Sequence, residues 1–201
     1  MDKEVIDNHT NYLKRLEFYR SFGYDLEGER DFILEKSLPL SGNMLEIGTG
    51  KGHFALALAK RGFSFISVDI SQDEQEIARL NLRYYGLEKL VTLKIENAEK
   101  LSFPDRSFDV IFSINVFHHL YKPEAVLNEM DRLLRPAGKV VLSDFNAKGF
   151  EIINACHTAE GRVHDRSRHD LDEAKQYFAH KGFEVSECHS KTQRVLVAQR
   201  K

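Results

Sequence analysis

The 201-residue sequence has little cysteine, no long apolar run and almost no net charge. Only Cys156 and Cys188 occur, so a disulfide framework is not indicated and a reduced, cytoplasmic setting fits best. The charged N-terminus lacks the apolar segment of a signal peptide, and apolar runs such as 110–116 are much shorter than a membrane span. A formal net charge of −2 gives no overall attraction to nucleic acid or to an anionic membrane. We therefore expect no membrane contact and a small molecule, rather than nucleic acid, as the partner; no pattern specifies an oligomeric state.

The length and the pattern of apolar residues predict a single domain, 1–201, that begins with helices and continues as alternating strands and helices. In the N-terminal part, 1–40, apolar residues at helical spacing predict a helical cap with breaks at Gly23 and Gly28. In the central part, 43–144, alternating strands and helices predict a parallel sheet covered on both faces. The expected strands are 44–47, 63–68, 91–95, 108–114 and 139–142, and the expected helices are 53–60, 73–85 and 123–134.

The C-terminal part, 145–201, has a different pattern. A polar, histidine-rich segment without a clear period, 146–168, is expected to be lid-like. A helix over 171–180 and two strands over 183–188 and 194–198 follow. Because few residues separate these strands, they are predicted to pair as an antiparallel hairpin.

A glycine-rich turn joins the expected strand 44–47 to a helix that begins near His53. The turn contains three glycines, Gly48, Gly50 and Gly52. Such a turn lets a ligand approach unpaired N–H groups at the helix start. Glu46 adds a carboxylate, which suits an ammonium or sulfonium group better than a pyrophosphate. Asp69 ends the next strand, where a carboxylate can accept both ribose hydroxyls of an adenosine. Together these residues indicate a nucleoside with a positively charged tail.

The spacing of the turn argues against two other nucleotide motifs. The dinucleotide fingerprint G-x-G-x-x-G needs glycine at position 53, where His53 stands. The P-loop needs Ser or Thr after Gly50-Lys51, where Gly52 stands. A nicotinamide-dependent oxidoreductase is thus an alternative that His53 and Glu46 disfavour.

The stretch from 43 to about 144 resembles the class I S-adenosylmethionine (SAM)-dependent methyltransferases, particularly their small-molecule, type 11-like branch. Four motifs in the family's order carry the resemblance: LEIGTGKGHFALALAKRG, FISVDIS, NAEKLSFPDRSFDVIFSINVFHHL and LLRPAGKVVLSD. It implies a doubly wound, Rossmann-like α/β fold with a seven-stranded sheet of order 3-2-1-4-5-7-6, strand 7 antiparallel, preceded by N-terminal helices. It also implies methyl transfer from SAM to oxygen, nitrogen or carbon of a small molecule. A SAM-binding sensor or partner protein without transfer activity is the alternative.

The resemblance assigns a set of residues to SAM. They are Glu46, Gly48, Thr49, Gly50, Gly52, Asp69, Ile70, Asn97, Ala98, Ser113 and Asn115. Glu46 and the turn would border the methionine part, Asp69 the ribose and Ile70 the adenine face. Asn97 and Ala98 would lie at the adenine edge. Asn97 departs from the family's usual Asp; its carbonyl can still accept from the adenine amino group, or it can bond its own backbone instead.

Catalytic residues are not conspicuous in the sequence, because methyl transfer from SAM depends mainly on alignment and needs a base only for a protonated acceptor. His118 and His119 follow the expected strand 108–114, at the sheet edge where ligands bind. They are candidate bases, with a packing role as the alternative. We expect His118 to face the acceptor and Tyr19 to contribute to its pocket.

No metal is expected. The C-terminal part contains possible ligands, namely Cys156, His157, His164, Asp165, His169 and Asp170. None of them has the spacing of an established zinc site, so a solvated loop is favoured.

Overall fold

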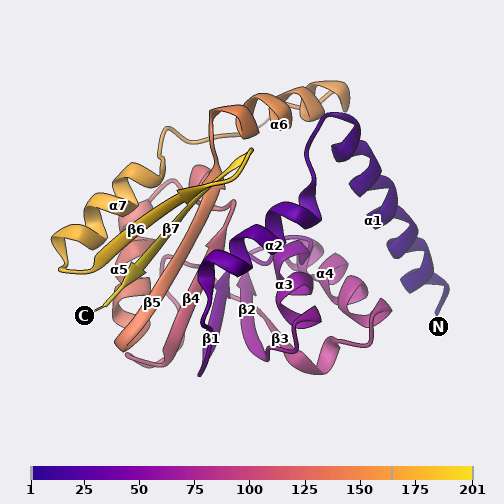
Figure 1. Cartoon of the computed structure of the whole chain (residues 1–201). Coiled ribbons are helices and arrows are strands. Elements are labelled where there is room, and N and C mark those ends of the chain that lie inside the picture. The colour runs from indigo at the N-terminus through magenta and orange to yellow at the C-terminus, as the bar shows by residue number, and fades with distance from the viewer. Residues whose placement is uncertain (1, 164, 201) are drawn as a thin grey trace.

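The computed structural model describes residues 2–163 and 165–200, and its centre is a single seven-stranded sheet (Figure 1). The strands are β1 (Met44–Ile47), β2 (Phe65–Asp69), β3 (Val91–Ile95), β4 (Phe108–Ile114), β5 (Leu134–Phe145), β6 (Glu184–His189) and β7 (Gln193–Gln199). Their order is β3-β2-β1-β4-β5-β7-β6. The first five strands pair in parallel, whereas β7 is antiparallel to both β5 and β6. The predicted strand order and the antiparallel seventh strand are confirmed.

Helices cover both faces of the sheet (Figure 1). They are α1 (Lys3–Ser21), α2 (Leu26–Ser37), α3 (His53–Lys60), α4 (Gln72–Tyr84), α5 (Pro123–Leu133), α6 (Ala147–Ala159) and α7 (Leu171–His180), with short 3-10 turns η1 (Glu88–Leu90) and η2 (Phe117–His119). One apolar core joins the sheet to α1–α4 and α6, and the other joins it to α5 and α7. In β4, Phe112 belongs to the first core and Ile111 to the second, as the alternation of strand side chains requires. Burial on both faces explains why the central strands are continuous apolar runs.

Helix α6 corrects the prediction of an irregular segment over 146–168. Ile152, Ile153 and Cys156 recur at helical spacing and are buried. The Asn146 side chain caps the helix by accepting the N–H of Gly149 at 2.9 Å. This apolar face is narrow and lies among polar residues, so its period is weak in the sequence.

Helix α2 also differs from its prediction, because it begins before the expected break at Gly28. The Asp25 carboxylate accepts the Gly28 N–H at 3.3 Å and caps the first turn. A side chain at position 28 would lie 2.5 Å from that carboxylate. The glycine therefore belongs to the cap, and the helix continues through it.

The turn between β6 and β7 holds α2 against the sheet. The buried Glu29 carboxylate accepts hydrogen bonds from the hydroxyls of Ser190 and Thr192. The Tyr24 hydroxyl, just before α2, accepts from the Gln193 amide at 3.2 Å. Hydrogen bonds to an ionised acceptor are strong, so the end of the chain fixes the position of the N-terminal cap. Among the described residues, no helix has the length and apolarity needed to cross a membrane.

Candidate functional site

A cavity of about 650 Å³ opens at the carboxyl ends of β1, β2 and β4. Most of the residues predicted to bind the cofactor line it: Glu46, Gly48, Thr49, Gly50, Asp69, Ile70, Asn97, Ala98 and Asn115. Gly52 and Ser113 do not. A side chain at position 52 would come within 2.7 Å of the Ala78 Cβ, so Gly52 permits α3 to pack on α4, whereas Ser113 is buried within β4. The volume is that of a site for a medium-sized organic ligand.

Glu46 is a buried carboxylate at the end of β1, with 1% of its surface exposed. Ser67 donates a hydrogen bond to its Oε2 at 2.5 Å, and the Ala55 N–H in the first turn of α3 is also directed at it. Burial nevertheless raises the pKa of Glu46 to about 8, because two hydrogen bonds do not replace the lost hydration. A positively charged ligand group beside it would favour the ionised form.

Four N–H groups of the glycine-rich turn, those of Gly48, Thr49, Gly50 and Gly52, are paired within the protein, whereas the expectation was that the N–H groups here are unpaired. Gly48 and Thr49 donate to the Val68 carbonyl at 2.8 and 3.1 Å. Gly50 donates to Asp69 Oδ2 at 2.7 Å. Gly48 has φ +90°, and a Cβ there would lie 2.2 Å from a methyl group of Val116. The turn is therefore a tight connection, and a carboxylate occupies the N–H of Gly50.

Asp69 ends β2 and connects the turn to the next helix. Its Oδ2 accepts from Gly50 and its Oδ1 accepts the N–H of Ser71 at 2.9 Å. Each carboxylate oxygen has a second lone pair, so both can still accept a ligand hydroxyl. Ile70 follows with 71% of its surface exposed and lines the same cavity, which provides an apolar surface beside the carboxylate.

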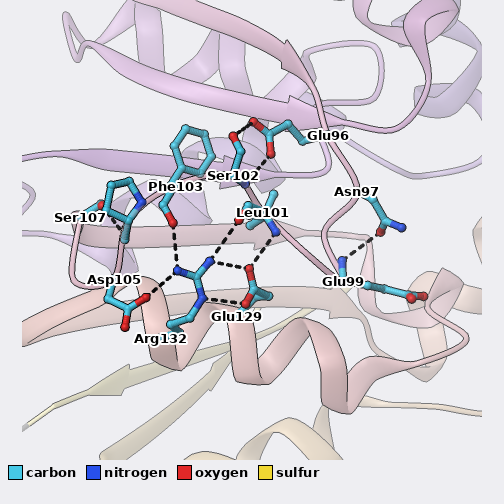
Figure 2. Close-up of polar contacts among 11 residues, drawn as sticks. Glu96, Asn97, Glu99, Leu101, Ser102, Phe103, Asp105, Ser107, Glu129 and Arg132 are labelled. Carbon is cyan, nitrogen blue, oxygen red and sulfur yellow. Dashed lines mark hydrogen bonds and ion pairs between the residues drawn. The ribbon is translucent and has the colours of Figure 1, made fainter.

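The loop after β3 forms the next wall and is fixed by a dense set of polar contacts (Figure 2). Arg132 of α5 donates to the carbonyls of Leu101 and Phe103 at 3.1 and 2.9 Å and pairs with the carboxylates of Glu129 and Asp105.

Within the loop, Glu96 and Asn97 form further contacts. Glu96 accepts from Ser102, and Asn97 Oδ1 accepts the Glu99 N–H at 2.9 Å. The Asn97 carbonyl thus makes the local backbone contact that was the alternative to adenine recognition. Its second lone pair can still accept a hydrogen bond from an adenine amino group.

Three buried polar atoms on the cavity wall have no hydrogen-bond partner within the described part of the chain. They are Asn115 Oδ1, Arg30 Nε and His53 Nδ1. Asn115 has a left-handed backbone, φ +57°, held by a 2.7 Å bond from its N–H to the Ser143 carbonyl. Orphaned buried groups are costly, so their presence around one cavity indicates a ligand that supplies partners.

Arg30 and His53 are cavity residues that the sequence reasoning did not assign. Arg30 is on α2 and only 6% exposed. The sequence does contain an indication of this role, because Arg30 shares the buried face of α2 with Ile33 and Leu34. A charged residue on the apolar face of a helix is unusual. Burial, together with the cations Arg30 and Lys51, lowers the pKa of His53 to about 3, so His53 is neutral at physiological pH.

The two adjacent histidines occupy different environments. His118 is 2% exposed, and its Nδ1 lies 2.6 Å from Asp144 Oδ1. The other Asp144 oxygen accepts the His118 N–H at 3.0 Å. This carboxylate holds the proton on Nδ1 and leaves the lone pair on Nε2. His119 lines the cavity, and burial lowers its pKa; His118 lies behind the wall, with its ring against Phe150 of α6 at 5.3 Å.

Tyr19 does not line the cavity, because its ring packs under Arg15 at 5.5 Å and edge-on to Tyr24 at 5.7 Å. Within 2–163 and 165–200 there is no group of three or more potential metal ligands. His164, one of the possible ligands in the C-terminal part, lies outside the described residues.

Comparison with known proteins agrees with this geometry. Residues 45–142 match the family model of a methyltransferase domain. A phosphatidylethanolamine N-methyltransferase of Cereibacter sphaeroides is 30% identical over 144 residues, which cover 71% of this chain and 70% of that protein. The uncharacterized methyltransferase YcgJ of Bacillus subtilis is 30% identical over 80% of this chain and 64% of its own length. The crystal structure of the PH0226 protein from Pyrococcus horikoshii superposes with a TM-score of 0.71 at 20% identity, covering 94% of this chain and 92% of that one.

The chain is shorter than several of the curated relatives that it matches. The matched region spans 38% of the length of two of them and 64% of YcgJ.

Proposed function

The chain belongs to the class I SAM-dependent methyltransferase family, and we propose that it transfers the methyl group of SAM to a small-molecule acceptor. The observation that carries this proposal is the presence of two carboxylates, Glu46 and Asp69, on the wall of one cavity, with Asp69 bound to the N–H of Gly50 in the glycine turn. A cationic nucleoside fits such a site, whereas a pyrophosphate does not.

The lining residues match the parts of SAM. Glu46 would accept from the ammonium group of the methionine part, Asp69 would accept from the ribose hydroxyls, and Ile70 would cover the adenine ring. Ala98 and Asn97 would lie at the adenine edge. The orphaned Asn115 Oδ1 would gain a hydrogen-bond donor from a ligand. When bound, SAM supplies a methyl group that is activated by the positive sulfur.

The protein's task is then to align the acceptor and exclude water. For an acceptor that carries a proton, we assign the role of general base to His118, because Asp144 fixes its tautomer with the lone pair on Nε2. His118 is 2% exposed and packs against Phe145 and Phe150, so this role requires a rearrangement that brings Nε2 to the acceptor. His119, on the cavity wall, would shape the pocket.

A small acceptor is supported by the net charge of −2, which offers nucleic acid no attraction. Relatives are named as a phosphatidylethanolamine N-methyltransferase and as ubiquinone biosynthesis O-methyltransferases. Nitrogen and oxygen acceptors both fit the proposal.

Calorimetric titration tests the cofactor part of the proposal. S-adenosylhomocysteine (SAH), the demethylated product, should bind to the folded chain, and NAD should not. Binding of NAD without SAH would overturn the proposal.

A panel assay tests the transfer part. SAM with a radioactive methyl group is incubated with amine, phenol and carbon-acid acceptors, and label in an organic product supports transfer. SAH binding with no labelled product from any class would favour the SAM-binding protein without transfer activity.

The histidine roles are tested by comparing His118→Gln with His119→Gln. We expect His118→Gln to lower kcat for a hydroxyl acceptor with little change in KM. We expect His119→Gln to change mainly KM. The reverse pattern would give the base role to His119.

A further inference from the structure

Arg30 is a buried cation without a counterion, and it lies on the wall of the cofactor cavity. Arg30 Nη1 donates a hydrogen bond to the Tyr24 hydroxyl at 3.3 Å. Its Nε is buried and has no hydrogen-bond partner in the described part of the chain. No carboxylate of those residues forms an ion pair with it. Burying an unpaired guanidinium is costly, so a site that retains one is built for an anionic ligand group.

The surroundings of Arg30 limit which anion can bind there. Glu46 lies close enough for the guanidinium to favour its ionised form. His53, the other polar neighbour, is neutral because its pKa is lowered to about 3. One end of the cavity therefore presents a buried guanidinium, Arg30, and a buried carboxyl group, Glu46, which a ligand cation would ionise. The ligand group that complements both is a zwitterion, such as an α-amino acid.

We propose that Arg30 binds the carboxylate of the methionine part of SAM, opposite the ammonium at Glu46. This inference rests on the proposed function and adds a specificity-determining residue from outside the matched region 45–142. The fork of a guanidinium matches the two oxygens of a carboxylate, and Nε is on the edge that makes such a paired contact.

The N-terminal cap gains a defined role from this assignment. Arg30 is adjacent to Glu29, whose carboxylate binds the hydroxyls of Ser190 and Thr192 in the β6–β7 turn. Tyr24, which holds Arg30, is itself bound by Gln193 at the start of β7. The C-terminal hairpin thus positions the helix that delivers the arginine to the cavity.

The test compares two ligands that differ only in the carboxylate: SAH and its decarboxylated analogue, S-adenosyl-3-thiopropylamine. Calorimetry on the wild-type chain should give SAH a Kd about 10- to 100-fold lower, as expected for loss of a charge-assisted hydrogen bond. In Arg30→Met the two ligands should bind with equal affinity, because the group that distinguishes them is gone. Arg30→Lys, which retains the charge without the fork, should fall between.

Arg15→Met is the matched control, since Arg15 lies in the neighbouring cavity but is paired with Glu160. It should keep the wild-type ratio of the two affinities. The melting temperature of ligand-free Arg30→Met should equal or exceed that of the wild type, because an unpaired buried charge is removed.

Three results would overturn the proposal. One is a wild-type chain that binds both ligands equally, and another is an Arg30→Met variant that weakens both by the same factor and melts earlier. The third is an unchanged ratio in Arg30→Met with a raised KM for the acceptor, which would assign Arg30 to an acceptor anion. Failure of the wild type to bind SAH at all would instead refute the proposed function.

Discussion

Ligand affinity should depend on pH through Glu46, because its pKa is raised to about 8 by burial. At pH 7 only about a tenth of the free protein then has Glu46 ionised, and a ligand ammonium binds best to that fraction. Ionising the carboxylate at pH 7 costs about 1.4 kcal/mol, which corresponds to a Kd about tenfold higher than at pH 9. Binding at pH 7 should also release about 0.9 of a proton from this group.

The assay is calorimetric titration of SAH between pH 6 and pH 9, in buffers of different ionisation enthalpy. Glu46→Gln is the control, because the amide has the same shape and does not titrate; it also reports any titration of the ligand itself. The difference between the two proteins isolates Glu46. Equal pH slopes for wild type and Glu46→Gln would refute the reasoning.

The same pKa shift predicts a stability effect without ligand. Glu46 ionises near pH 4.5 in the unfolded chain and near 8 in the folded one, so between these values the unfolded state binds fewer protons. The free energy of unfolding therefore falls as pH rises from 4.5 to 8 and is constant above that. Glu46→Gln should be increasingly more stable than the wild type over that window. A difference in melting temperature that shrinks toward pH 8 would contradict the shift.

Three further changes have defined outcomes. Asp69→Ala should weaken SAH binding by about 1.5–3 kcal/mol, the value of a charged hydrogen bond; calorimetry giving an unchanged Kd in a folded variant would exclude the ribose role. Gly48→Ala should lower the free energy of unfolding by more than about 1 kcal/mol in urea titrations, because its Cβ would lie 2.2 Å from Val116 at φ +90°; Gly50→Ala, with open space around its Cβ, should cost less, and equal losses would show that the clash is relieved. Arg132→Met should accelerate amide hydrogen exchange over residues 99–105 and reduce SAH affinity, since Arg132 binds three residues of the loop; unchanged exchange would show that the loop is held by other contacts.

Much of the fold was predictable because its signals are local. β1, β3 and β4 agree with their predicted bounds, 44–47, 91–95 and 108–114. β1 and β4 are mainly apolar runs buried on both faces, whereas β3 is an edge strand in which apolar Val91, Leu93 and Ile95 alternate with Thr92 and Lys94. The antiparallel pair β6–β7 followed from the short connection between two strands, which leaves no room for a crossover helix.

Other features depend on tertiary contacts that a sequence does not display. The N–H groups of Gly48, Thr49 and Gly50 are paired with the Val68 carbonyl and with Asp69, which are distant in sequence and adjacent across β1 and β2. The position of Arg30 on the apolar face of α2 is visible in the sequence, but its place on the cavity wall depends on how the contacts of Glu29 dock the helix. Ser113 is buried within β4, where it pairs with Leu142 of β5, and the register of the strands places it away from the cavity lining.

A crystal structure with SAH bound would test the central claim most directly. The account predicts SAH in the 650 Å³ cavity, with its ammonium within 3.2 Å of Glu46, its ribose hydroxyls on Asp69 and its adenine against Ile70, distances typical of hydrogen bonds and direct packing. SAH found at another surface, or in this cavity with the methionine part beside Ile70 and the adenine beside Glu46, would contradict it.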